Sequence, residues 1–145
     1  YGLFIEGMRE LIQATPDNPQ LKNVLALFCL DYNLELQLAD DSIRDALRAD
    51  PDNPGFLLTS GRTQYVLDRH QEAIQTMERL VDMGKADYQA YYILGLSHLE
   101  LKDAAGARHY LEMAVQTDPE RGEARDALRK LGESASSPQG ERKES

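Results

Sequence analysis

The sequence repeats itself with a period of 34 residues, and this period constrains the fold more than any other feature of the chain. Gly61 and Gly95 are 34 positions apart and end the corresponding segments Leu-Leu-Thr-Ser-Gly and Tyr-Tyr-Ile-Leu-Gly. The segment Pro-Asp-Asn-Pro at residues 16–19 recurs at residues 51–54, at a spacing of 35. One unit of this length cannot bury its apolar face alone, so several units must stack on one another.

The spacing of apolar residues within each unit is helical. Ile74, Met77 and Leu80 recur three positions apart, and no run alternates as a strand does. Proline separates several of the helices because it disfavours the α conformation of the residue before it, and Gly84 can end another helix as a left-handed cap. Asn18 and Asn53 can cap the helices that follow them. The pattern predicts an all-α fold with helices at about residues 2–14, 19–34, 38–49, 54–68, 70–83, 88–101, 104–117 and 122–132.

These residues resemble the tetratricopeptide repeat, a helix-turn-helix unit of 34 residues. Residues 88–121 match its pattern best, and residues 54–87 and 19–53 match it less fully. The matching positions in the best unit are an aromatic residue, a Leu-Gly pair, two small residues and a final proline: Tyr91, Leu94, Gly95, Ala107, Ala114 and Pro119. Small residues at these sites allow two helices to cross closely.

The resemblance implies a right-handed superhelical solenoid of antiparallel helix pairs over residues 1–132. Residues 1–18 would be a partial repeat, because they resemble only the second helix of a hairpin, and we expect further repeats or a partner before them in the parent protein. Three repeats would follow, then an amphipathic capping helix that shields the end of the stack. The repeats and the cap are assigned to residues 19–53, 54–87, 88–121 and 122–132. Residues 133–145 carry no hydrophobe larger than Ala135 and are predicted to be disordered.

The same resemblance implies a concave groove lined by the first helix of each repeat, where this family usually binds a segment of another protein. The inward positions of a unit are its residues 2, 5, 9, 12 and 13. We expect eight of these residues to form a partner-binding strip that is largely aromatic and aliphatic and carries one arginine. The eight residues are Asn23, Leu27, Leu58, Arg62, Tyr65, Tyr92, Leu96 and Leu99.

One specialised form of this groove is missing from these repeats. Co-chaperones of the family hold the EEVD tails of heat-shock chaperones with a clamp of Lys, Asn and Arg side chains. The corresponding positions here are Asn23, Leu27, Thr59, Gln89 and Ile93. The sequence therefore argues against a chaperone-tail adaptor built from these repeats.

Composition excludes several other kinds of function. The chain has 16 Lys and Arg against 25 Asp and Glu, so its formal net charge of −9 disfavours nucleic acid as a partner. We expect acidic residues such as Asp40 and Asp41 to lie at the start of a helix, on its solvent-exposed outer surface. No apolar run is long enough for direct membrane insertion. The single cysteine and the spacing of the three histidines give no metal or cofactor motif, and we find no catalytic motif.

The sequence thus predicts a non-enzymatic scaffold that binds a peptide or helix of a protein partner in the concave groove. Two alternatives stay open. The chain could be a regulatory or localising segment of a larger enzyme or of an envelope or secretion assembly protein. It could also self-associate as a homo-oligomer through its N-terminal end, where apolar residues gather at Leu3, Phe4, Met8 and Leu11. We expect a cytoplasmic location, or a periplasmic one if the parent protein carries a signal peptide.

Overall fold

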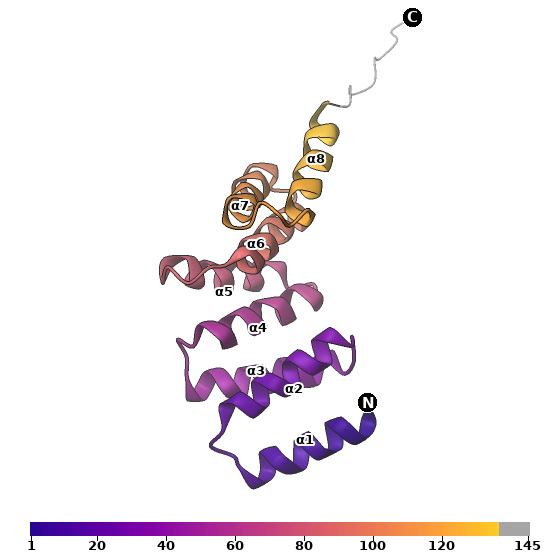
Figure 1. The fold of residues 1–145 in the computed structure, drawn as a ribbon, viewed down its shortest axis with the longest axis vertical. Helices are drawn as coiled ribbons and strands as arrows, with labels where there is room; N and C mark the ends of the chain where they lie inside the picture. The colour runs from indigo at the N-terminus through magenta and orange to yellow at the C-terminus, as the bar shows by residue number, and fades with distance from the viewer. Residues whose placement is uncertain (137–145) are drawn as a thin grey trace, which may run out of the picture.

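The computed structural model describes residues 1–136, and these residues form eight α-helices and no strand. The prediction of an all-α fold is confirmed. The helices stack in chain order, so the N-terminus and the end of α8 lie at opposite ends of the molecule (Figure 1). Their bounds are α1 (Gly2–Ala14), α2 (Pro19–Asp31), α3 (Leu36–Ala49), α4 (Pro54–Val66), α5 (His70–Asp82), α6 (Tyr88–Glu100), α7 (Ala104–Thr117) and α8 (Glu123–Ser136).

Each hairpin turns through a residue with a left-handed backbone. Asn33, Asp68 and Lys102 occupy the same position in successive units and have φ of 51°, 58° and 62°. After each of them, the next residue's N–H donates to a carbonyl five positions back, as Asp103 N does to His98 O at 2.9 Å. This is the Schellman arrangement, which satisfies the last carbonyls of a helix.

The caps between hairpins agree only in part with the sequence. Gly84 has φ of 67°, as expected for a left-handed cap, and the next N–H, that of Lys85, donates to Leu80 O at 2.9 Å. Asn53 Oδ1 accepts from the N–H of Phe56 at 3.2 Å and so caps α4 as predicted. The side chain of Asn18 makes no such bond at α2, so that prediction was wrong.

Two glycines allow the helices of a hairpin to approach one another. A Cβ atom built at Gly61 would lie 2.4 Å from Met77 Cε, and one built at Gly95 would lie 2.6 Å from Leu111 Cγ. Such distances are well inside van der Waals contact, so a side chain at either position would force its neighbour to move. The flexible Met77 side chain can yield at Gly61, whereas at Gly95 the backbone N of Leu111 is also close, at 3.3 Å. The buried side chains between the hairpins form three clusters that follow one another along the stack.

Asp40 corrects the expectation that the acidic residues of this region are solvated helix-start groups. Helix α3 begins at Leu36, two residues earlier than predicted, so Asp40 lies in its second turn. Its side chain is only 2% exposed, and its Oδ2 accepts a hydrogen bond from Arg69 Nη1 at 2.8 Å. The same oxygen forms an ion pair with Arg44 Nε at 3.1 Å. The bond to Asp40 raises the pKa of Arg69. Asp40 therefore ties α3 to the turn before α5, while Asp41 is exposed.

The C-terminal helix is longer than the predicted capping helix. We expected it to end at residue 132 and the tail to be disordered from residue 133, but α8 continues to Ser136. Gly132 weakens a helix without ending it, because it has no positive φ here. Ser134 Oγ also donates to Lys130 O at 3.0 Å within the helix. The rest of the predicted tail, residues 137–145, lies outside the described residues.

Candidate functional site

The eight residues predicted to line the groove lie on the first helices α2, α4 and α6, and each of them is half-buried. Half-burial is what a groove wall requires, since one side of the residue packs inward and the other faces solvent. Leu58 and Tyr65 pack against the middle apolar cluster, and Tyr92 and Leu99 pack against the C-terminal one. The structure brings the eight together unevenly, because Tyr92, Leu96 and Leu99 of α6 line one pocket and the other five do not line it.

On α2 and α4 the polar residues of the predicted set differ in their contacts. Arg62 Nη2 donates to Asp31 Oδ1 at 3.1 Å and so connects α4 to the end of α2. Asn23 Oδ1 is buried and has no hydrogen-bond partner among residues 1–136. Burial is the main cause of the raised pKa of the Tyr65 hydroxyl, and the negative charge of Glu100 raises it further.

Helix α8 is held against α6 by Tyr88. The Tyr88 hydroxyl accepts from the backbone N–H of Ala124 at 3.0 Å and donates to Glu123 Oε2 at 3.3 Å. The guanidinium of Arg121 lies over the Tyr88 ring, 4.8 Å from its centroid, in a cation–π contact. Since Tyr88 and Ala124 are both buried, these contacts fix where α8 begins.

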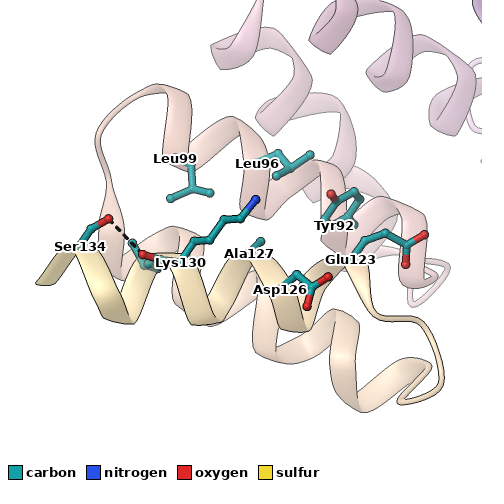
Figure 2. Close-up of a pocket in the computed structure, with 9 residues that line it drawn as sticks. Tyr92, Leu96, Leu99, Glu123, Asp126, Ala127, Lys130 and Ser134 are labelled. Carbon is teal, nitrogen blue, oxygen red and sulfur yellow. Dashed lines mark hydrogen bonds between the residues drawn. The ribbon is translucent and has the colours of Figure 1, made fainter. Parts of the chain in front are cut away.

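A pocket of about 490 Å³ lies between α6 and α8. Figure 2 shows Tyr92, Leu96 and Leu99 on α6 facing α8 across it. Its α8 side is lined by both apolar and polar side chains: Glu123, Asp126, Ala127, Lys130, Leu131 and Ser134. The pocket thus has an apolar interior and a charged rim, which is the usual composition of a site that orients a ligand.

The charges on the rim are separated along α8. Glu123 and Asp126 lie at the Tyr92 end, and the Lys130 side chain reaches toward Leu96 (Figure 2). Burial is the main cause of the raised pKa of the Tyr92 hydroxyl. Tyr88 and the carboxylates of Glu123 and Asp126 raise it further. The phenol of Tyr92 therefore stays neutral at physiological pH and can donate a hydrogen bond at this end of the pocket.

The pocket residues of α8 were not among those predicted from the sequence, because α8 was treated only as a cap. The signal was present in the repeat period. A further unit counted from Gly122 has five inward positions, which are Glu123, Asp126, Lys130, Glu133 and Ser134. All of them except Glu133 line the pocket, so α8 takes the place of the first helix of a fourth repeat.

The N-terminal end exposes only part of the apolar set considered for self-association. Leu3 is 87% exposed, Phe4 41% and Leu11 45%, whereas Met8 is buried in the chain's own core. Met8 therefore cannot belong to a free face. Phe4 also stacks on Phe28 of α2, with ring centroids 4.0 Å apart.

Neither a metal centre nor a membrane span is found among the described residues. No group of three or more His, Cys, Asp or Glu side chains that could hold a metal ion is found among residues 1–136. None of the helices in residues 1–136 is long and apolar enough to cross a membrane. His98 of α6 is stacked on Tyr110 of α7, and its Nδ1 lies 2.8 Å from Asp103 Oδ2.

Comparison with known proteins places these features in a family. The model of the tetratricopeptide repeat matches residues 31–87 and 58–122. A curated relative is the BBSome complex member BBS4 of Bos taurus, which is 24% identical over 153 residues. The alignment covers 82% of this chain, and the chain spans only 29% of that protein's length.

Two solved structures share the fold. The crystal structure of MamA has a TM-score of 0.82 at 21% identity, covering 90% of this chain and 76% of that one. The structure of YrrB, described as a TPR protein with an unusual peptide-binding site, has a TM-score of 0.76 at 21% identity, covering 91% and 68%. At such identities the likeness concerns the fold alone, and it confirms the predicted solenoid of helix pairs. Because the family model spans most of the described helices, this chain belongs to the tetratricopeptide repeat family.

Proposed function

We propose that this protein is a non-enzymatic scaffold that binds a peptide or helix of a protein partner along the groove formed by α2, α4, α6 and α8. The observation that carries the proposal is the pocket between α6 and α8, where Tyr92, Leu96 and Leu99 form an apolar wall. Ligand pockets are lined mainly by hydrophobic and aromatic side chains, and tyrosine is enriched among the residues that dominate binding energy. The structural relative YrrB is described as having a peptide-binding site, which supports the same kind of ligand.

Selection from an unbiased peptide library displayed on phage would test this function. Peptides selected on the full chain should perturb the NMR signals of backbone amides in α6 and α8. Leu96→Ser should weaken their binding about tenfold or more, because an apolar side chain of this size contributes about 1.5–3 kcal/mol when fully buried.

The matched control is Leu101→Ser, since Leu101 is 44% exposed at the end of α6 and does not line the pocket. This variant should bind as the unaltered chain does. If selection yields no peptide, or if the selected peptides bind the Leu96→Ser variant with undiminished affinity, the proposed function is wrong.

A further inference from the structure

The pocket between α6 and α8 carries acidic side chains at its Tyr92 end and a lysine farther along α8, and this arrangement bears on which ligands fit. The carboxylates of Glu123 and Asp126 lie beside Tyr92, whereas the ammonium group of Lys130 lies toward Leu96 (Figure 2). Asp126 Oδ1 is 3.2 Å from Arg129 Nη2, but that pair is exposed, with 57% of the Asp126 side chain accessible to solvent. A ligand group can therefore still approach the Asp126 carboxylate.

The pocket also has an apolar lining. Leu96 and Leu99 contribute from α6, and Ala127 and Leu131 contribute from α8. Ala127 is the smallest of these side chains and follows Asp126 directly in the sequence, so it leaves room for a ligand side chain beside the carboxylates. An aliphatic or aromatic side chain of a ligand is the group that such a space would accept.

The helix rise gives the spacing of the backbone positions that carry these charged side chains. Asp126 and Glu123 precede Lys130 by four and seven residues, which corresponds to about 6 and 10 Å along α8. A span of 10 Å is about three residues of extended chain or seven residues of helix. The two charged groups of a ligand would thus lie within about four residues of the apolar anchor, one on either side.

From this geometry we infer that the pocket selects peptide segments of mixed charge: an apolar anchor residue flanked by a basic side chain, which meets Glu123 and Asp126, and by an acidic side chain, which meets Lys130. The inference rests on the proposed function and adds the chemistry of the partner to it. Charge complementarity of this kind fixes the register of a bound segment more than it raises affinity.

Synthetic peptides with a single central Leu provide the probe. Four charge patterns are compared on a Gly, Ser and Ala background, with the charged residues two, three or four positions from the Leu: Lys–Leu–Glu, Glu–Leu–Lys, Lys–Leu–Lys and Glu–Leu–Glu. Each peptide is titrated into the isotope-labelled full chain, and binding is followed by the amide signals of α6 and α8. One mixed pattern should bind about fivefold or more tightly than either like-charged pattern, since each exposed ion pair contributes only a modest amount.

Charge reversal at Lys130 gives the sharper readout. The Lys130→Glu variant should change its preference to the doubly basic peptide, whereas Arg108→Glu, which makes the same change on the exposed face of α7, should keep the preference for mixed charge. Equal binding of all four peptides, or an unchanged preference in Lys130→Glu, would overturn this inference and leave the proposed function standing. If neither these peptides nor the library-selected ones perturb α6 and α8, both proposals fail.

Discussion

At Gly95 the residue type is constrained by Leu111, which lies opposite it on the other helix of the hairpin. Leu111 is fully buried and lies against the position that a Cβ atom at Gly95 would occupy, and Leu111 N would be 3.3 Å from that atom. The backbone of α7 therefore limits how far Leu111 can retreat. Gly7, in contrast, has no atom within 4 Å of the same position, although it is also inside a helix.

Substituting each of these glycines by alanine should have opposite effects. Gly95→Ala should lower the free energy of unfolding by about 1–2 kcal/mol, because overpacking outweighs the gain in helix propensity. Gly7→Ala should raise it by up to about 1 kcal/mol, since only the propensity changes. Urea unfolding followed by circular dichroism measures both values. A stabilising Gly95→Ala would mean that α6 and α7 are not in close contact at this point.

At the scale of elements, the turns between paired helices repeat one backbone shape with different residues. The left-handed position is occupied by Asn33, Asp68 and Lys102 in successive hairpins. Asn and Asp tolerate this conformation better than other residues with side chains, but Lys does not share that advantage. The backbone shape of the turn is thus set by the hydrogen bonds that end the helix, although a lysine at position 102 disfavours the left-handed conformation.

Lys102→Gly should therefore stabilise the protein. We expect a gain of about 0.5–1 kcal/mol, because glycine removes the clash of a left-handed residue but loses more backbone entropy on folding. Lys102→Ala should give little change, as alanine keeps the Cβ atom. Gly84→Ala, at φ of 67°, should destabilise by about 1 kcal/mol. Thermal unfolding of the three variants tests the series, and a destabilised Lys102→Gly would contradict it.

For the molecule as a whole, α8 has two roles that cannot be separated. It covers the end of the stack, because Ala124 is fully buried against Tyr88 and the α7 residues Leu111 and Ala114. It also forms one wall of the pocket. In a solenoid each unit contacts only its neighbours, so loss of α8 should be felt first in α6 and α7.

A chain shortened to residues 1–122 should be less stable by about 2–4 kcal/mol, the amount expected when one or two large apolar side chains become exposed. Hydrogen exchange should be faster in α6 and α7 and unchanged in α2 and α3. The matched control is a chain shortened to residues 1–136, which keeps all of α8. Equal protection of α7 in the two shortened chains would show that α8 does not support the stack.

The 34-residue period, the helical spacing and the Pro and Gly separators were enough to predict eight helices, their order and the family. These are local properties, since they depend on residues three or four positions apart and on backbone preferences. The repeat period also led us to expect inward positions in each first helix, because it transfers a position from one unit to the next.

Contacts between units, however, were decided only by the tertiary structure. Nothing in the local pattern distinguishes Asp40 from Asp41, yet the first is buried between Arg44 and Arg69 while the second is exposed. Likewise, the amphipathic pattern of residues 122–132 fits a simple cap, and only the docking of α8 on Tyr88 makes Asp126 and Lys130 part of a pocket. The physical reason is that a solenoid buries its polar links and opens its pockets between units, where side chains distant in the sequence meet.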